Sequence, residues 1–314
     1  MSSYSPDDLK ACHERIKPYI HRTPVLRSRL LDQMAGAELY FKCENFQRAG
    51  SYKIRGATHA LLLKKESGPL PAVVTQSSGN FAQALSLAAR NLDVPAYIVM
   101  PESAPEVKKR AVQAYGGQVI ECPSTLEARE SEAERIRREK GAGVIHPSND
   151  PMVMLGQGTA CLELLEEVGD LDYAVAPVGG GGLLGGTALA TAFFSSGCEP
   201  VGAEPLQVDD AYRSLKAGKI LGNESTDTIA DGLKTVLGSY TFPVIQDHVK
   251  TIIRVTEDEI VSAMRLIWER MKIVVEPSSA VALAAVLREP DVFQGKKTGI
   301  LISGGNVDLG KLPF

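Results

Sequence analysis

Residues 173–183 read Tyr-Ala-Val-Ala-Pro-Val-Gly-Gly-Gly-Gly-Leu. The apolar run before the glycines predicts a buried strand, and the apolar residues 183–194 predict a helix directly after them. Consecutive glycine N–H groups at a helix N-terminus can converge on a phosphate, because no side chain hinders the approach and the helix dipole adds positive potential. The spacing is not the Gly-x-Gly-x-x-Gly of dinucleotide sites. We therefore predict a phosphate-binding loop at 179–182, with a merely flexible strand–helix connection as the alternative.

Strand-like and helix-like segments alternate on both sides of this loop. Short β-branched runs are followed by longer amphipathic runs, a rhythm typical of parallel sheets with helices on both faces. The sequence therefore predicts the α/β class. The strands are expected at 72–75, 96–100, 118–120, 143–145, 173–178 and 200–203, and the helices at 80–91, 105–115, 125–140, 156–168 and 183–194.

Two breaks interrupt this rhythm. Residues 66–71 contain two prolines and a glycine, and residues 146–151 contain two further prolines, which break both helix and strand. We therefore predict a small mobile domain at 68–147, inserted into a larger discontinuous domain formed by 1–67 and 148–314. Because ligands of open α/β sheets bind beyond the carboxyl ends of the strands, we expect the site in the cleft between the two domains.

Composition and charge narrow the class of protein. The 314 residues are 44% apolar and 23% charged, as in ordinary globular proteins. The net charge of −4 argues against nucleic acid or an anionic membrane as a partner. The polar N-terminus does not resemble a secretory signal, and no apolar run is long enough to cross a bilayer. The five scattered cysteines predict free thiols and a cytoplasmic protein, and the histidines lack zinc-site spacing.

Three segments far apart in the chain favour one shared pocket. Residues 51–53 (Ser-Tyr-Lys) offer an amine, 179–182 offer backbone N–H groups, and 303–306 (Ser-Gly-Gly-Asn) offer a hydroxyl beside a glycine turn. A lysine at a helix start is usually a solvated charge, but here Ser51 is a candidate helix cap and an aromatic residue follows it. Pyridoxal 5′-phosphate (PLP) needs such groups at its aldehyde, its phosphate and its ring nitrogen. Together the segments predict a PLP enzyme.

These segments and several others, in order along nearly the whole chain, resemble the fold-type II (β-family) PLP enzymes. Within that family the chain is most similar to the serine/threonine dehydratase group, which includes serine racemases and hydroxyaspartate dehydratases. The resemblance implies a fold like the tryptophan synthase β subunit: two open twisted sheets flanked by helices, with the cofactor in the interdomain cleft. The matching stretches are 42–47, 50–57, 77–80, 156–159, 177–182, 228–232, 276–278 and 303–308.

The resemblance also implies how the cofactor is held. Lys53 would be the Schiff-base lysine and the base that removes the substrate Cα proton. Asn80 would hydrogen-bond the O3′ oxygen of PLP, and Ser303 would face the pyridine nitrogen. Tyr52, where the family usually has Phe, would pack beside the ring. The phosphate would be bound by Gly179, Gly180, Gly181, Gly182 and the N–H of Leu183.

The same resemblance implies a substrate site. It would lie at the N-terminus of the 80–91 helix, where N–H groups would bind the substrate carboxylate. Phe81 replaces the family His, which either alters substrate choice or changes packing alone. Arg129 and Thr235 match positions that reach the carboxylate when the small domain closes, with an ordinary surface charge as the alternative for Arg129. The implied substrate residues are Ser77, Ser78, Asn80, Phe81, Arg129 and Thr235.

A metal site and an assembly are implied as well. Glu204 and Asp210, with the backbone carbonyl of Val208, match family positions that hold Mg²⁺, Ca²⁺ or Mn²⁺ through oxygen atoms and waters. The alternative is a pair of solvated surface acids. By resemblance alone we also expect a homodimer and consider ATP as an effector.

The residues at the ring nitrogen favour one reaction class. A neutral hydroxyl at Ser303 stabilises a carbanion less than an acid would, which suits β-elimination of L-serine, L-threonine or 3-hydroxyaspartate to a 2-oxo acid and ammonia. Ser78 stands where serine racemases carry the proton donor for the opposite face of Cα, so racemase activity is a second candidate beside elimination. The alternative is a hydroxyl that only bonds the loop backbone, because hydroxyaspartate dehydratases share this serine. Three alternatives stay open: primarily a racemase, a β-replacement enzyme like the cysteine synthases, or a catalytically weak PLP-binding regulator, which Phe81 suggests.

Overall fold

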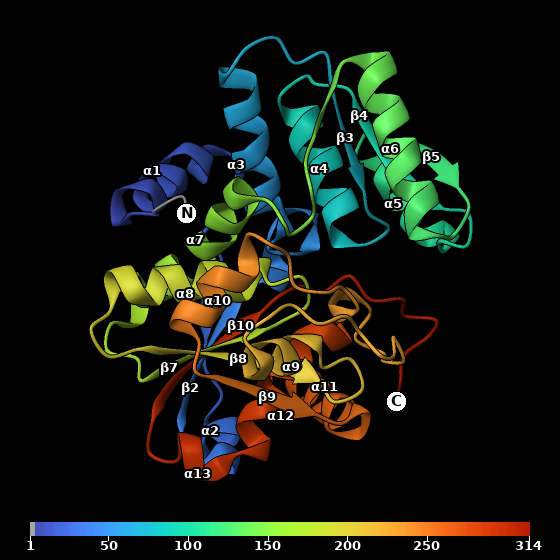
Figure 1. Ribbon diagram of the computed structural model, residues 1–314. Coiled ribbons are helices and arrows are strands. Elements are labelled where there is room, and N and C mark those ends of the chain that lie inside the picture. The colour runs from blue at the N-terminus through green and yellow to red at the C-terminus, as the bar shows by residue number, and fades with distance from the viewer. Residues whose placement is uncertain (1–3) are drawn as a thin grey trace.

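Two separate sheets organise the molecule. The structure is a computed structural model that describes residues 4–314. In Figure 1 the smaller sheet lies above the larger one, and α7 (Pro151–Val168) and α8 (Gly182–Phe194) pack between them. Apart from one antiparallel pair, every strand pairing in both sheets is parallel. The predicted α/β class with two mostly parallel sheets is therefore confirmed.

The larger sheet has six strands in the order β1-β2-β10-β7-β8-β9, and only β1 runs antiparallel to its neighbour. Successive residues of β7 serve opposite faces, because side chains alternate along a strand. Ala174 and Ala176 pack in the core formed with α7 and α8, whereas Val175 packs in the core on the other face. The strands are β1 (Val25–Leu26), β2 (Glu38–Cys43), β7 (Tyr173–Pro177), β8 (Glu199–Pro205), β9 (Thr251–Val255) and β10 (Lys297–Ile302).

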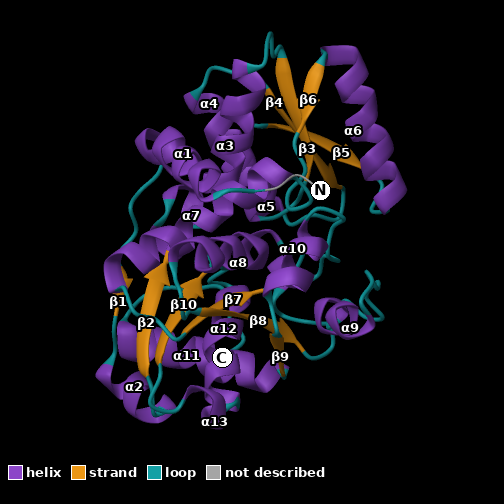
Figure 2. Cartoon of the chain, turned by 60° about the vertical axis from the view of Figure 1, so that its left-hand side comes forward, coloured by secondary structure: helices purple, strands orange, loops and turns teal. Residues whose placement is uncertain are grey.

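The second face of the larger sheet is covered by helices from both ends of the chain. Figure 2 shows α2, α11 and α12 on the side of this sheet away from α7 and α8. Their buried side chains form one core with Val175, Ile300 and Ile302. These helices are α2 (Arg29–Ala35), α11 (Glu257–Met271) and α12 (Pro277–Arg288), with the short α13 (Pro290–Phe293) after them.

The smaller sheet has four parallel strands in the order β5-β4-β3-β6. Val73 of β3 packs in the core that includes α4, whereas its neighbour Val74 packs with Ala133 and Ile136 of α6 on the opposite face. Helices therefore cover both faces, as the alternating sequence predicts. The elements are β3 (Ala72–Gln76), β4 (Ala96–Pro101), β5 (Gln118–Cys122), β6 (Ala142–Val144), α4 (Asn80–Asn91), α5 (Glu106–Ala114) and α6 (Leu126–Lys140).

The start of α7 differs from the sequence expectation. The predicted helix at 156–168 begins earlier, at Pro151. Asp150 is its N-cap, and its carboxylate accepts from the N–H groups of Met152 at 2.8 Å and Val153 at 3.2 Å. A proline in the first turn loses nothing there, because that N–H has no intrahelical acceptor. The break at 146–151 is therefore shorter than expected, since its second proline belongs to a helix.

Glycines bring three helices unusually close together. A Cβ at Gly156 of α7 would lie 2.4 Å from the Cα of Gly56 in α3 (Lys53–Glu66), and a Cβ at Gly186 of α8 would lie 2.4 Å from the N of Gly158 in α7. No side chain fits at such distances, so glycine is required at both crossings. As a result α7 holds the first turn of α3 and the start of α8 on its two sides.

Two general properties of the chain and a few remaining elements complete the fold. Within residues 4–314, none of the helices has both the length and the apolar character that a membrane span requires. All five cysteines are buried and free. The other helices are α1 (Pro6–Ile16), α9 (Asp210–Ala217) and α10 (Thr241–His248), and the 3₁₀ turns are Lys17–Tyr19, Glu44–Phe46, Arg48–Gly50 and Asp231–Leu233.

Candidate functional site

Lys53 is the first residue of α3, and the segment before it lies against the loop that follows β10. Ser51 forms an isolated antiparallel bridge with Gly304, and the N–H of Tyr52 donates to the carbonyl of Ser303 at 3.0 Å. Two of the three predicted segments are therefore in direct contact. The expectation that Ser51 caps the helix is wrong. Tyr52 is the N-cap, and the Ser51 hydroxyl is buried without a partner.

The amine of Lys53 is held beside the connection between β6 and α7. Its Nζ donates to the carbonyl oxygen of Pro147 at 3.3 Å and lies 4.9 Å from the centre of the Tyr52 ring. The next residue, Ser148, touches the glycine loop, because a Cβ at Gly180 would lie 2.2 Å from the Ser148 hydroxyl. One short stretch of chain thus connects the amine to the predicted phosphate loop.

The four glycines follow β7 and lead into α8. Gly181 is the N-cap of this helix with φ of 83°, a left-handed conformation that favours glycine. The first N–H groups of a helix have no intrahelical acceptor, so they point freely toward an anion. Thr235 borders the loop, since its hydroxyl would be 3.1 Å from a Cβ at Gly179. The geometry therefore agrees with an anion-binding turn.

Ser303 is a buried residue that directly follows β10, and its hydroxyl contacts the hydroxyl of a second serine, Ser279. The Ser279 and Ser303 hydroxyl oxygens lie 2.9 Å apart. Ser279 donates its only hydroxyl hydrogen to the Gly304 carbonyl at 2.6 Å and accepts from the Gly304 N–H at 2.7 Å. The sequence did not indicate Ser279, and only its position after the matched stretch 276–278 could have suggested it. No acidic side chain takes part in this pair of neutral hydroxyls.

Asn80 is the first residue of α4, and its amide is held on both sides. Its Nδ2 donates to both carboxylate oxygens of Glu276, at 2.8 and 3.0 Å. Its Oδ1 accepts from Nδ2 of Asn306 at 3.0 Å. Sequence reasoning assigned no role to Glu276 or Asn306. Both lie within matched stretches of the chain, and this was the one signal that could have found them.

The other predicted substrate residues occupy different surroundings. Ser77 and Ser78 form the turn between β3 and α4, next to Asn80. Phe81 is only 2% exposed and packs in the core shared by α3, α4 and α7. Arg129 lies on α6, where its Nε donates to the carbonyl of the N-cap residue Thr125 at 3.4 Å.

Two of the predicted metal residues lie near each other, since the Asp210 charge acts on Glu204. Glu204, at the end of β8, accepts from the N–H groups of Ala211 at 3.0 Å and Tyr212 at 2.9 Å. One carboxylate oxygen of Asp210 accepts from the N–H of Leu237 at 3.1 Å, and the other is buried without a partner. Burial and the nearby Asp210 charge raise the pKa of Glu204 to about 9, and burial raises the pKa of Asp210 to about 6.

An acidic pair with an unpartnered oxygen fits a hard cation, which prefers oxygen ligands. Val208 is fully buried between these two acids along the chain. Within residues 4–314, no cluster of three or more His, Cys, Asp or Glu side chains is arranged to bind a metal. A cation here would therefore need backbone carbonyl oxygens and water beside the two carboxylates.

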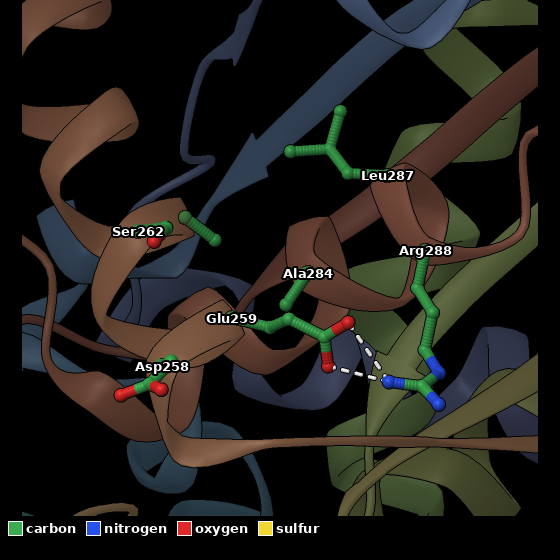
Figure 3. Close-up of a pocket in the computed structure, with 7 residues that line it drawn as sticks. Asp258, Glu259, Ser262, Ala284, Leu287 and Arg288 are labelled. Carbon is green, nitrogen blue, oxygen red and sulfur yellow. Dashed lines mark hydrogen bonds and ion pairs between the residues drawn. The ribbon is translucent and has the colours of Figure 1, made fainter.

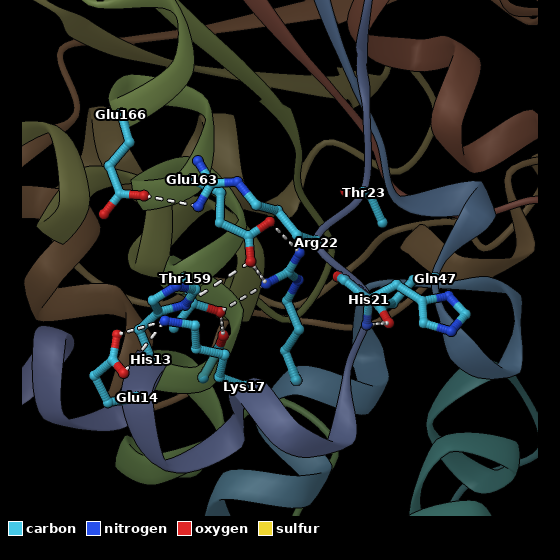
Figure 4. Close-up of polar contacts among 12 residues, drawn as sticks. His13, Glu14, Lys17, His21, Arg22, Thr23, Gln47, Thr159, Glu163 and Glu166 are labelled. Carbon is cyan, nitrogen blue, oxygen red and sulfur yellow. Dashed lines mark hydrogen bonds and ion pairs between the residues drawn. The ribbon is translucent and has the colours of Figure 1, made fainter.

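A fully buried ion network anchors the start of α3. Arg55 donates to both oxygens of Glu44 and both oxygens of Glu163, each at 2.8 Å. Lys42 also contacts Glu163 at 2.7 Å, and Thr159 accepts from Arg55 at 3.2 Å. Figure 4 shows Glu163 and Thr159, which both belong to α7. Burial alone would raise the pKa of Glu163, but the contacts from Arg55 and Lys42 hold it at about 2.

One cavity of about 220 Å³ lies elsewhere, between α11 and α12. Figure 3 shows Glu259 and Arg288 paired across it, with a shortest contact of 2.7 Å. None of the residues predicted for the functional site lines this cavity. It therefore belongs to the helical layer on the far face of the larger sheet.

Residues 16–304 match the family model described as pyridoxal-phosphate dependent enzyme. The chain belongs to this family. It is 46% identical to the β-hydroxyaspartate dehydratase of Paracoccus denitrificans, over 98% of each chain. The serine racemase structure from Dictyostelium discoideum superposes with a TM-score of 0.93 at 50% identity, covering 97% of this chain and 99% of that one. The structure of threonine deaminase from T.th. gives a TM-score of 0.93 at 44% identity, covering 98% and 99%.

PLP is the cofactor of this family, and the residues of this site fit it. The aldehyde of PLP reacts with an amine, its phosphate needs N–H donors, and its ring nitrogen needs a polar partner. The amine of Lys53, the glycine loop and the Ser303 hydroxyl supply these three groups. They lie on the start of α3, the start of α8 and the end of β10, which the contacts described above bring together.

Proposed function

We propose that this PLP enzyme eliminates water from a β-hydroxy amino acid and releases a 2-oxo acid and ammonia. L-serine, L-threonine and 3-hydroxyaspartate are the candidate substrates. The support comes from relatives that match over nearly their whole length and are named β-hydroxyaspartate dehydratase, serine racemase and threonine deaminase. The observation that carries the proposal is the neutral Ser279–Ser303 hydroxyl pair, 2.9 Å apart, beside the backbone of Tyr52 and Lys53.

In this proposal Lys53 holds the cofactor and moves the substrate proton. Its amine would hold the cofactor at the aldehyde, and the same amine would take the proton from the substrate Cα. The N–H groups of residues 179–183 would bind the phosphate, and the ring of Tyr52 would pack beside the cofactor. Asn80 would donate to the O3′ oxygen. PLP supplies, when bound, an electron sink for the electrons released at Cα.

A hydroxyl at Ser303 leaves the ring nitrogen without an acidic partner. A weaker electron sink favours a reaction in which the leaving hydroxide takes the electrons as the proton departs, which is β-elimination. Ser279 supports this role because it keeps Ser303 in place through the bonded Gly304 backbone. Replacement of a β-substituent by a second nucleophile, as in the cysteine synthases, lacks a specific observation in its favour.

Substrate binding is proposed at the N-terminus of α4. Ser77, Ser78 and Asn80 surround that end, where helix N–H groups favour a carboxylate. We propose that residues 68–147 move as a small domain, with 1–67 and 148–314 as the large one, and that closure brings Arg129 and Thr235 to the substrate carboxylate. Phe81, the second residue of α4, adds apolar bulk near this helix end and is buried in the core.

Racemisation is the second candidate activity, and the residue that suggests it is Ser78. A hydroxyl on the face of Cα opposite Lys53 could return a proton from the other side and invert the centre. Ser78 lies in the turn directly before Asn80. A single enzyme can perform both reactions, because they share removal of the same Cα proton.

Four finer features complete the proposal. We propose that Glu204, Asp210 and the carbonyl of Val208 bind Mg²⁺, or Ca²⁺ or Mn²⁺ in its place. The unpartnered Asp210 oxygen supports this. We further propose a homodimer, ATP as an effector and a cytoplasmic location. The buried free cysteines are consistent with a reducing compartment.

The test is a substrate screen with the PLP-loaded protein. Serine, threonine and the stereoisomers of 3-hydroxyaspartate are supplied singly, 2-oxo acid and ammonia are quantified, and residual amino acid is resolved on a chiral column. We expect stoichiometric oxo acid and ammonia from at least one substrate, with some inversion of serine. A protein that binds PLP yet converts none of them would contradict the proposal and favour the weak-regulator alternative. Repeating the assay with ATP, and measuring mass by light scattering, tests the effector and the dimer.

A further inference from the structure

Glu276 is a buried carboxylate that the proposed reaction leaves without a role. Its residue is only 3% exposed. It is the N-cap residue of α12, yet its side chain makes no capping hydrogen bond. Glutamate is not among the usual N-cap residues, and a buried carboxylate is rare unless it is paired. This carboxylate points instead to the amide of Asn80, in the smaller sheet's first helix.

The geometry of that contact leaves one donor of Asn80 free. Nδ2 of Asn80 lies 2.8 and 3.0 Å from the two oxygens of Glu276. The two oxygens of one carboxylate subtend a narrow angle at the nitrogen, far smaller than the angle between its two N–H bonds. One N–H therefore serves both oxygens, and the second N–H points away from Glu276.

A third residue removes the remaining freedom of the Asn80 amide. Nδ2 of Asn306 donates to Oδ1 of Asn80 at 3.0 Å and to the Ala49 carbonyl at 2.8 Å. With its oxygen bound by Asn306 and one N–H bound by Glu276, the amide cannot flip without losing three contacts. The free N–H is therefore fixed in direction.

Glu276 also lies at the ring-nitrogen end of the site. Its N–H donates to the Gly304 carbonyl at 3.1 Å, and a Cβ at Gly304 would lie 3.0 Å from its carboxylate. Gly304 directly follows Ser303. The carboxylate thus stands between the segment that carries Ser303 and the helix that carries Asn80.

The charges that face Glu276 come from two further elements. Asp231 of the 3₁₀ turn at Asp231–Leu233 and Lys108 of α5 act on it with opposite sign, and these two residues form an ion pair with each other. Burial raises the pKa of Glu276 to about 7, although the Asn80 amide and the Asn306 backbone N–H pull it down. Neutral amides, and no cation, are therefore its direct partners.

We propose that Glu276 is a positioning residue of the cofactor site, which orients the Asn80 amide so that its free N–H meets the O3′ oxygen of PLP. The inference rests on the proposed function, which assigns that contact to Asn80. It adds a residue that holds the donor rather than touching the cofactor. It also ties α4, which carries the proposed substrate site, to the N-terminus of α12.

The experiment measures PLP binding without any substrate. Cofactor-free wild type, Glu276→Ala and Asn80→Ala, and the double variant, are titrated with PLP while visible absorbance is recorded. We expect Glu276→Ala to weaken PLP binding about tenfold, the effect of losing one hydrogen bond to a charged group, and to shift the absorbance maximum. In the Asn80→Ala background the same substitution should change affinity less than about twofold, because the amide that Glu276 orients is gone.

Two further variants make the result decisive. Glu289 is also an N-cap residue followed by proline, at the surface before α13, so Glu289→Ala should bind PLP like wild type. Glu276→Gln keeps the shape and one acceptor oxygen, and should restore affinity to within about threefold of wild type. If Glu276→Ala does not fold by circular dichroism, the pair Glu276→Gln and Glu276→Leu replaces it in the same cycle.

Wild-type affinity and absorbance in Glu276→Ala would overturn the inference, as would full additivity with Asn80→Ala. Because no turnover is measured, these outcomes are independent of the substrate screen. A protein that converts none of the hydroxy amino acids can still show the coupling, and an active one can still lack it.

Discussion

The guanidinium of Arg55 and the carboxylate of Glu163 form two hydrogen bonds of 2.8 Å in a fully buried site. Arg55 belongs to the first turn of α3, as does Lys53. The parallel arrangement of donors and acceptors fixes the rotation of that turn, because a bidentate pair restricts both partners. The position of Lys53 therefore depends on a contact between α3 and α7.

Replacing Arg55 by Met should lower stability markedly. Two buried carboxylates, Glu44 and Glu163, would lose their main partner, and breaking a buried pair costs about 3–5 kcal/mol. Urea unfolding of the cofactor-free protein measures the change. Arg22→Met is the matched control, because Arg22 pairs at 2.9 Å with Glu166 of the same helix but at the surface, where a pair contributes about 0–1 kcal/mol. Equal losses in both variants would contradict this prediction.

Acid should weaken the protein through Glu163. Its pKa is about 2 in the folded chain, against an ordinary value of 4.5, so the native state binds fewer protons than the unfolded one in this window. The stabilising contribution is complete above pH 4.5 and is lost as the pH falls toward 2, by about 3 kcal/mol in total. Unfolding free energies at several pH values should fall more steeply for wild type than for Glu163→Gln. The surface variant Glu166→Gln should keep the wild-type slope.

Lys53→Ala should abolish covalent attachment of PLP and nearly all turnover. The variant loses both the amine that bonds the aldehyde and the base at Cα, and a general base alone accounts for about 10²- to 10⁴-fold in rate. Borohydride reduction followed by peptide mass analysis should label Lys53 in wild type and nothing in the variant. Lys64→Ala, at the other end of α3, is the control and should be labelled normally. A label on another lysine would refute the assignment.

Removing divalent cations should lower the melting temperature. A bound cation would keep both buried carboxylates charged, whereas without it burial leaves Glu204 protonated, because its pKa is then about 9. Loss of a saturating ligand is expected to cost on the order of 5 °C. Differential scanning fluorimetry with EDTA, and then with added Mg²⁺, measures this. Asp210→Asn should flatten the response. Asp209→Asn should retain it, because that carboxylate pairs with Arg213 and Arg254 instead.

Ser78→Ala should separate the two proposed activities. Loss of a proton donor on one face of Cα is expected to reduce serine inversion by about 10²-fold, while elimination, which needs only Lys53, stays within about threefold. Chiral chromatography and oxo-acid formation are measured on the same samples. Ser103→Ala, an exposed serine paired with Ser124, should change neither activity. Parallel losses of both reactions in Ser78→Ala would mean that this hydroxyl serves substrate binding.

Local signals in the sequence were sufficient to predict the fold class and to propose the glycine loop as a phosphate site. The helix expected at 80–91 is α4, with the same bounds, because its apolar spacing and length are properties of neighbouring residues. The strand–glycine–helix order around 179–182 likewise depends on a few consecutive residues. Matched stretches along the chain then identified the family correctly, and they single out Lys53 as the predicted Schiff-base lysine.

The contacts that hold these groups were decided by the tertiary structure. Strand β10 inserts between β2 and β7, and this order brings Ser303 and Gly304 beside Ser51. It also brings Glu276 and Asn306 to Asn80, from the opposite end of the chain. No periodicity or local propensity encodes such pairs, because they form only when long-range packing excludes water and each buried polar group must find a partner.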